Sequence, residues 1–234
     1  MTEPVELTIF VPAYKEAQNL AALLPRIVAA VSVLESSYEI IVVDTVRPMD
    51  DTRAVCSRVQ GNIIYANTDY ADSYCNAVRT GIRLARGKYF IALDADGSHD
   101  PEFIRQLYFN KEGADVVIAS RYVDGGGTQN SKIEILMSKF VNIIYAMVLN
   151  LDCKDVSNSF KLYKTQELKA LKLKSKNFDI IEEILFKLKK NKKYLVIKEL
   201  AFTFKTRIYG QTKRKLVLFA LTYLFTLIKL KLGK

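Results

Sequence analysis

The chain has 234 residues, of which 50% are hydrophobic and 26% charged, and its formal net charge is +10. This length suits one large α/β domain with a substantial core. The odd, scattered cysteines at 56, 75 and 153 argue against a disulfide framework and lack metal-ligand spacing. The first ten residues have neither the basic start nor the small-residue cleavage site of a signal peptide, so we expect a cytoplasmic protein.

The charge is divided unevenly along the chain. Residues 1–160 hold 15 Lys and Arg against 20 Asp and Glu, a net charge of −5, whereas residues 161–234 hold 20 against 5, a net charge of +15. A lysine-rich end can lie on an anionic membrane surface, where each nearby Lys contributes roughly 1 kcal/mol, or it can contact nucleic acid. The third interpretation is a solvated surface without a partner.

Strand and helix patterns alternate over the first half of the chain. Apolar runs predict strands at residues 7–12, 38–44, 62–66, 89–93 and 114–122, with helices at 16–35 and around 77–85. This alternation predicts βαβ units and a mostly parallel sheet. After three glycines at 125–127, the pattern predicts a mostly apolar helix at 132–151, an amphipathic helix at 178–190, an extended segment at 194–207 and a last helix from residue 211.

The predicted strand at 89–93 is followed by two carboxylates, Asp94 and Asp96. Open α/β sheets bind ligands at the carboxyl ends of their strands. Two acids one residue apart, with the hydroxyl of Ser98 beside them, suit a hard divalent cation that keeps its other positions for water and the oxygens of a diphosphate. The alternative is a turn in which the acids only cap the helix that begins near Pro101.

Two uncharged stretches are too short to cross a bilayer. Residues 140–151 and 216–228 contain 12 and 13 residues without a charge, whereas a spanning helix needs about 20. Lysines flank the second stretch, which favours insertion at a membrane interface or contact with a hydrophobic partner. Burial in the core is the alternative for both.

Seven motifs occur in order over about residues 5–215: FVPAYKEAQNL, VVD, DADGSHDP, ASRYVDGGG, DVSNSFKLY, FDIIEEI and ELAFTFKTRIYGQTK. In this series the chain resembles the family 2 inverting glycosyltransferases of the GT-A fold, and within them the group of dolichol-phosphate mannose synthases and polyprenyl-phosphate glycosyltransferases. The resemblance implies a Rossmann-like, three-layer α/β domain with a mostly parallel central sheet at 1–215. The apolar, lysine-flanked C-terminal helix at 216–234 is expected to be part of the same single domain and to contact a membrane interface or a partner.

The resemblance also implies a site for a nucleotide sugar and a metal ion. The nucleotide-sugar residues that it implies are Pro12, Tyr14, Glu16, Asp44 and Asp94. The implied ligands of the metal, Mg²⁺ or Mn²⁺, are Asp94, Asp96 and Ser98. The implied catalytic residues are Asp94, Asp96, Arg121, Arg207 and Lys213. Three cations at a diphosphate make chemical sense, because they neutralise the charge of the leaving group.

The implied acceptor site consists of Arg121, Lys132, Ser138, Asn142 and Glu183. The sequence departs from the family's pattern at four places, and at one of them Asp72, Ser73 and Tyr74 replace a Gly-rich turn before the helix around 77–85. Thr45 stands in place of the second of two adjacent aspartates, which leaves open which nucleobase the donor site selects. Glu134 replaces an arginine, so phosphate binding there would fall to Lys132 or Lys139. Asn158 replaces a glycine.

Three functions are compatible with these residues. The first is transfer of a hexose from a GDP- or UDP-sugar to a polyprenyl (dolichyl or undecaprenyl) phosphate, by an enzyme peripheral on the cytosolic face of the membrane and without a nucleic-acid partner. Because the acceptor phosphate is already ionised, this reaction needs cations and no strong base. The second is transfer to a glycan hydroxyl in cell-surface polysaccharide or lipopolysaccharide synthesis, which needs a base; Glu182 and Glu183 are the candidates, unless they lie on a solvated helix face. The third is a non-catalytic binding relative. A membrane-protein partner or a homo-oligomer is compatible with each of the three.

Overall fold

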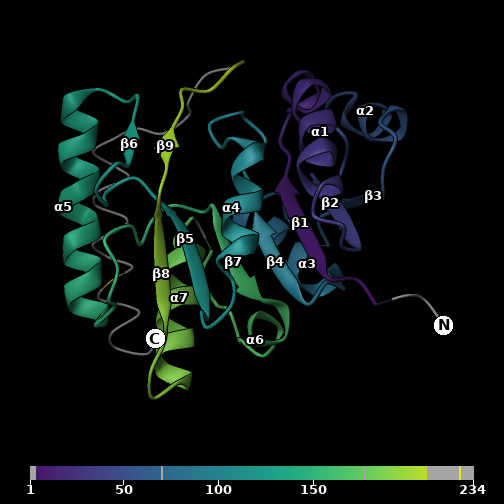
Figure 1. The fold of residues 1–234 in the computed structure, drawn as a ribbon. Helices are drawn as coiled ribbons and strands as arrows, with labels where there is room; N and C mark the ends of the chain where they lie inside the picture. Colours follow the sequence, from purple (N-terminus) through teal and green to yellow (C-terminus); the bar gives the residue numbers. More distant parts are fainter. Residues whose placement is uncertain (1–3, 70, 177, 210–226, 228–234) are drawn as a thin grey trace.

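The fold is organised around a seven-stranded sheet with the strand order β3-β2-β1-β4-β7-β5-β8 (Figure 1). The computed structural model describes residues 4–69, 71–176, 178–209 and 227. The strands of this sheet are β1 Leu7–Pro12, β2 Tyr38–Asp44, β3 Ile63–Asn67, β4 Tyr89–Ala92, β5 Val116–Ser120, β7 Lys161–Lys164 and β8 Ile197–Ala201. Two short strands, β6 Gly127–Thr128 and β9 Thr203–Phe204, pair in a second sheet.

The sheet is parallel except at β7. Strand β1 pairs in parallel with β2 on one side and β4 on the other, and β5 pairs in parallel with β8. Strand β7 lies between β4 and β5 and runs antiparallel to both. The predicted mostly parallel sheet is therefore confirmed, and the five predicted strands match within two residues at each end. The sequence patterns did not predict β7.

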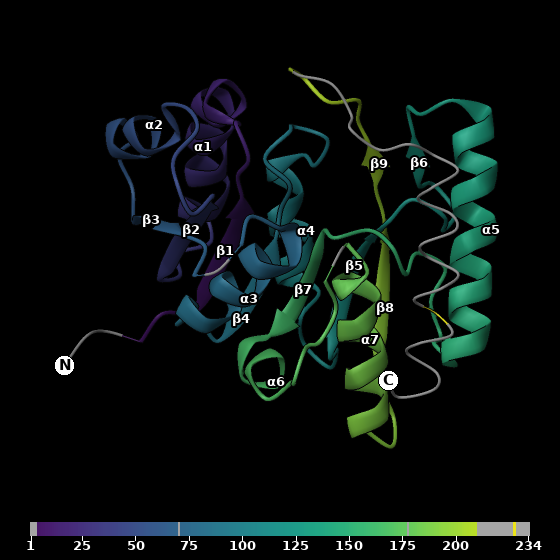
Figure 2. The ribbon, with the colours of Figure 1, turned by 180° about the vertical axis from the view of Figure 1, so that it is seen from behind.

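Helices cover both faces of the sheet and make three layers (Figures 1 and 2). One face carries α1 Ala17–Ser32, α2 Thr52–Arg58, the 3₁₀ turn Pro101–Phe103 and α4 Ile104–Phe109. The other carries α3 Tyr74–Leu84, α6 Thr165–Lys169 and α7 Ile180–Asn191. Because side chains alternate across a strand, Ile9 and Val11 pack in the first core while Phe10 packs in the second. Two buried cores therefore hold the sheet between the helices.

Helix α5, Lys132–Leu149, stands at the end of the sheet beyond β8 (Figures 1 and 2). It begins with a capping box in which Ser131 and Glu134 satisfy each other's backbone amides. It ends at Asn150, which adopts a left-handed conformation with φ of 53°. The departure at Glu134 thus has a structural role, because a glutamate at this position completes the cap.

The predicted C-terminal helix and the boundary at residue 216 lie almost wholly outside the described residues. Leu227 is described, and it is buried in the second core together with Tyr145 and Leu149 of α5. No helix in the described part of the chain is long and apolar enough to cross a bilayer.

Candidate functional site

The predicted acid pair lies directly after β4, at the carboxyl end of the parallel strands. The Oδ1 of Asp96 accepts hydrogen bonds from the Ser98 amide at 3.0 Å and the Ser98 hydroxyl at 2.5 Å. Its Oδ2 lies 3.2 Å from Nη2 of Arg207. Burial would raise the pKa of Asp96, but the Ser98 hydrogen bonds and the Arg207 charge outweigh burial and hold that pKa below its usual value. Asp96 is therefore kept ionised.

The segment that follows β9 lies across the acid loop. The backbone amides of Lys205 and Ile208 donate to the carbonyls of Ser98 and Asp96, each at 3.0 Å. Gly97 lies beneath this segment with φ of +80°, and a Cβ there would collide with the Ile208 side chain. The DADG sequence therefore needs its glycine both for the backbone conformation and for the close approach of residue 208.

Arg207 connects the acid loop to the N-terminal end of α1. Its Nη1 donates to Oε1 of Glu16 at 2.9 Å, while its Nη2 contacts Asp96. The buried Glu16 also accepts from Nδ2 of Asn19 at 2.5 Å, and Asn19 Oδ1 in turn accepts from the Tyr209 amide at 3.2 Å. The structure thus brings together three residues that the sequence predicted separately.

Arg121 has a carboxylate partner that sequence reasoning missed. Its Nε and Nη2 donate to the two oxygens of Asp155 at 2.8 and 2.7 Å, and Nη2 also donates to the Ser157 hydroxyl at 2.9 Å. Burial would raise the pKa of Asp155, but the charge and hydrogen bonds of Arg121, together with the charge of Lys161, outweigh burial and lower that pKa. The motif DVSNSFKLY contains both partners, yet nothing in its pattern indicates which cation they meet.

Asn142 brings the predicted acceptor helix to the same loop. Its Oδ1 accepts from the Ser157 amide at 2.9 Å and its Nδ2 donates to the Ser157 hydroxyl at 3.0 Å. Nδ2 lies 3.5 Å from the Ser138 hydroxyl, one turn earlier. Arg121, Ser138 and Asn142 therefore form one cluster, whereas Lys132 and Lys139 are exposed on α5.

Asp44 is buried and occupied by neighbouring groups. It accepts from the Thr45 amide at 2.7 Å and the Tyr65 hydroxyl at 2.9 Å. Burial, followed by the hydrogen bond to Asp44, raises the pKa of Tyr65 to about 12. The hydroxyl of Thr45 donates to the Arg47 carbonyl at 2.7 Å, so this departure from the family's pattern stabilises the turn after β2. Tyr14, by contrast, exposes 43% of its surface, and Pro12 ends β1.

Glu182 and Glu183 do not lie on a solvated face; that interpretation is wrong. Both are buried in α7. Glu183 accepts from the amides of Lys174 and Ser175 at 2.7 and 2.8 Å, and from Nζ of Lys187 at 2.6 Å. These contacts join the loop before α7 to the helix. The other predicted cation, Lys213, lies outside the described residues.

The donor set at the acid loop suits a divalent cation. Asp94 exposes 28% of its side chain and Asp96 20%, whereas Ser98 is buried and its hydroxyl donates to Asp96. Among the described residues no group of three or more His, Cys, Asp or Glu could form an all-protein cage. Mg²⁺ and similar ions are commonly held by one or two carboxylates plus water and phosphate oxygens, so the two carboxylates fit such an ion.

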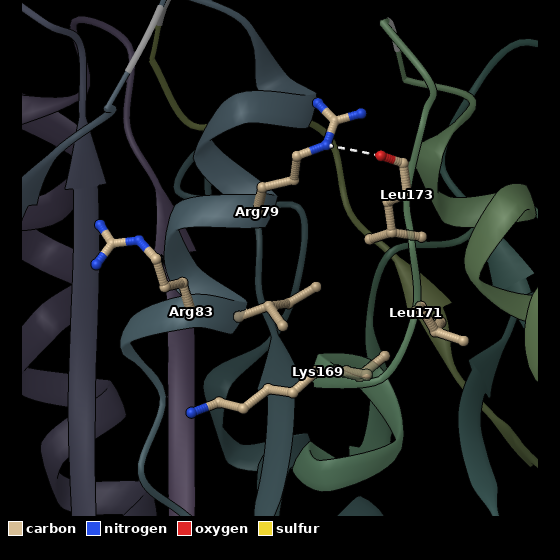
Figure 3. A pocket seen from close by; sticks show the side chains of 7 residues that line it. Arg79, Arg83, Lys169, Leu171 and Leu173 are labelled. Carbon is tan, nitrogen blue, oxygen red and sulfur yellow. Dashed lines mark hydrogen bonds between the residues drawn. The ribbon is translucent and has the colours of Figure 1, made fainter.

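A cavity of about 440 Å³ lies elsewhere, between α3 and α6 (Figure 3). Its lining residues are Arg79, Ile82, Arg83, Leu168, Lys169, Leu171 and Leu173. Two of its cations already have partners: Arg83 contacts Asp69 at 2.7 Å, and Arg79 donates to the Leu173 carbonyl at 3.3 Å. The lining includes none of the predicted site residues, so we place the candidate site at the acid loop.

The chain is similar to known proteins in sequence. The model of Glycosyl transferase family 2 matches residues 8–171. A dolichol-phosphate mannosyltransferase of Pyrococcus furiosus is 32% identical over 218 residues, which cover 90% of this chain and 60% of the relative. An undecaprenyl-phosphate mannosyltransferase of Micrococcus luteus is 31% identical over 219 residues, which cover 88% of this chain and 86% of the relative. The chain thus spans only part of the archaeal relative.

It is also similar to solved structures. Glucosyl-3-phosphoglycerate synthase from Mycobacterium tuberculosis, in complex with Mn²⁺, UDP and phosphoglyceric acid, superposes with a TM-score of 0.71 at 14% identity, covering 97% of this chain and 78% of that one. A mycobacterial protein gives a TM-score of 0.75 at 12% identity, covering 97% and 74%. At such identities the likeness establishes the fold alone.

Proposed function

The chain belongs to glycosyl transferase family 2, and from this membership we propose that it is an inverting glycosyltransferase that moves a hexose from a nucleotide sugar to a polyprenyl phosphate. The names of the archaeal and bacterial relatives support this class of acceptor. The observation that carries the proposal is the position of Arg207 between Asp96 and Glu16 at the carboxyl end of the sheet.

On the donor side, the proposal uses groups that surround Arg207. The exposed ring of Tyr14 stacks on the base, and the Glu16 carboxylate accepts from nucleoside hydroxyls. Arg207 moves from Asp96 to the diphosphate, where its planar fork binds two oxygens and neutralises the leaving group. Lys213 and Asp44 belong to the same proposed site.

Asp94, Asp96 and Ser98 would hold Mg²⁺ or Mn²⁺ beside the diphosphate. When bound, such an ion supplies Lewis-acid stabilisation of the phosphate charge. Arg207 would hold the departing diphosphate so that the anomeric carbon faces the acceptor, which gives an in-line displacement and inversion.

On the acceptor side, the cluster of Arg121, Ser138 and Asn142 positions the lipid phosphate, with Lys132 at the exposed start of the same helix. An ionised phosphate attacks without a general base. Of the two candidate bases for a sugar hydroxyl, Glu183 is already paired with Lys187 and two backbone amides, and Glu182 is fully buried. We therefore favour the lipid phosphate over a glycan hydroxyl, and the retained acid pair argues against a non-catalytic relative.

The outer face of α5 supports a peripheral position on the membrane. Five large apolar side chains, spaced three and four residues apart, are each more than half exposed: Ile133, Leu136, Phe140, Ile143 and Met147. We call this set the α5 stripe. An exposed apolar stripe on a helix that also carries Lys132 and Lys139 is suited to the surface of an anionic bilayer. The cytosolic face is part of this proposal.

The decisive experiment is a transfer assay. Purified protein is incubated with radiolabelled GDP-mannose, UDP-glucose or related donors, with Mn²⁺ or Mg²⁺, and with either a polyprenyl phosphate or saccharide acceptors. We expect label to enter the organic phase as a polyprenyl-phosphate sugar, and chelator to abolish the transfer. Label found only in saccharide products would refute the proposal of a lipid-phosphate acceptor. Absence of transfer with every donor would refute the proposal that the protein is a glycosyltransferase.

A further inference from the structure

His99, the single histidine of the chain, is fully buried behind the acid loop. Its ring stacks on Phe160 at a centroid distance of 4.8 Å, and Phe202 and Phe204 meet it edge-on at 6.1 and 5.5 Å. A polar ring enclosed by three aromatic side chains is costly to bury unless both of its nitrogens have partners.

Both nitrogens do have partners, and those partners determine the tautomer. The backbone amide of Asp94 donates to Nδ1 at 3.0 Å, so Nδ1 carries no hydrogen. In a neutral ring Nε2 then holds the proton, and it donates to Oδ1 of Asn158 at 3.0 Å. The Asn158 amide is itself oriented, because its Nδ2 donates to the Ala119 carbonyl at 2.6 Å.

Asn158 continues the connection to the phosphate-binding cation. Its backbone amide donates to Oδ1 of Asp155 at 3.2 Å. Asp155 holds the guanidinium of Arg121 through two hydrogen bonds. Phe204, which contacts the His99 ring, lies under the same guanidinium at 5.6 Å. Continuous contacts therefore run from the amide of Asp94 through His99 to Arg121.

We propose that His99 and Asn158 are a positioning pair that holds the acid loop after β4 at a defined place relative to Arg121. This inference rests on the proposed function, because it assigns the pair a purpose only if Asp94 and Asp96 receive the metal and Arg121 receives a phosphate. Neither residue touches a reacting atom. Each acts by directing a hydrogen bond to a segment that carries a functional group, as partners behind metal ligands do.

The test measures metal binding directly. His99→Phe keeps the ring stacking and removes both hydrogen bonds; Asn158→Ala leaves His99 in place and removes its acceptor. Mn²⁺ affinity, alone and with UDP or GDP, is measured by calorimetry on the full chain, and folding by circular dichroism and melting temperature. We expect each variant to bind Mn²⁺ about 10- to 100-fold more weakly. Because the two residues act on one contact, the double variant should be little weaker than either single one.

Phe103→Leu is the matched control. Phe103 packs against Phe160 and Phe202 in the same aromatic cluster, so its truncation should lower the melting temperature while leaving the Mn²⁺ affinity unchanged. Folded His99→Phe and Asn158→Ala proteins with wild-type Mn²⁺ affinity would overturn the inference, as would an equal loss of affinity in Phe103→Leu. If His99→Phe does not fold, Asn158→Ala alone decides. A wild-type protein that binds neither Mn²⁺ nor nucleotide would overturn the proposed function instead.

Discussion

Replacing Arg207 by alanine should have opposite effects on metal binding and on transfer. The guanidinium lies 3.2 Å from the Asp96 carboxylate and 2.9 Å from Glu16, so a metal ion that binds Asp96 must displace it. Two unit charges about 4 Å apart attract by about 4 kcal/mol at an effective dielectric of 20. The Arg207 side chain is 29% exposed and that of Asp96 20%, and solvent reduces such pairs to about 1 kcal/mol.

We therefore expect Arg207→Ala to bind Mn²⁺ in the absence of nucleotide about fivefold more tightly, since about 1.4 kcal/mol corresponds to a factor of ten. The same variant loses the cation that we propose stabilises the leaving group, and its kcat should fall about 10²- to 10³-fold. Calorimetric titration with Mn²⁺ and the transfer assay measure the two effects separately.

Lys205→Ala is the control for this prediction. Lys205 lies on the same segment but pairs with Asp100 at 2.5 Å and not with Asp96, so the Mn²⁺ affinity of this variant should equal that of the wild type. Weaker metal binding in Arg207→Ala, or an unchanged kcat, would show that Arg207 neither competes with the metal nor serves the leaving group.

Three further predictions follow from the contacts described. Asp96→Ala should abolish metal-dependent turnover while the protein still folds, as circular dichroism would show, and full activity of this variant would refute the assignment of Asp96 as a metal ligand. Burial lowers the pKa of Lys161 from 10.5 to about 8, so between these pH values the unfolded chain binds more protons than the folded one and stability rises with pH. Relative to Lys161→Met, the free energy of unfolding of the wild type should rise by about 3 kcal/mol between pH 8 and 10.5. Unfolding free energies of the two proteins that change in parallel with pH would contradict this. The double variant Leu136→Ser/Phe140→Ser should weaken binding to anionic vesicles, measured by flotation, by at least about tenfold. Phe109→Ser, which replaces a similarly exposed phenylalanine on α4, should not weaken it. Equal losses in both variants would exclude the α5 stripe as the membrane contact.

The strands that sequence patterns predicted are those with continuous apolar runs. Strands β1, β2 and β5 are buried along most of their length, as expected for parallel strands covered on both faces. The acid pair was predictable for the same reason, because the end of an apolar run marks the end of a strand. Local pattern was enough for these elements.

Strand β7 shows where local pattern fails. Its four residues begin with Lys161, which reads as a surface position. In the structure Lys161 is fully buried, and its Nζ donates to the carbonyls of Val156 and Asn158. Those carbonyls belong to the loop that carries Asp155, so hydrogen bonds to this loop compensate for the burial of the lysine. Neither residue propensity nor hydrophobic periodicity can predict that a lysine is buried by hydrogen bonds to carbonyls of a neighbouring loop.

The partners of the site cations could not be predicted either. Arg121 and Asp155 are 34 residues apart in the sequence, and Arg207 and Glu16 are 191 apart. Residue type indicates that an arginine can bind a phosphate, but only the fold determines which carboxylate pairs with that arginine. The same holds for Glu183, whose partners are the amides of the preceding loop.

These pairings have a consequence for the order of ligand binding. In the structure both arginines of the site face carboxylates: Arg207 faces Asp96 and Glu16, and Arg121 faces Asp155. A metal ion that binds alone would displace Arg207 and leave a partly buried cation with fewer partners. A nucleotide diphosphate that binds alone would face the ionised Asp96. Unpaired charge therefore opposes each of these separate binding steps. A metal–diphosphate complex would avoid both costs, because the metal ion would face Asp96 while its phosphate oxygens would face Arg207. Mn²⁺ and the nucleotide should therefore bind with positive cooperativity, each raising the affinity for the other by the same factor.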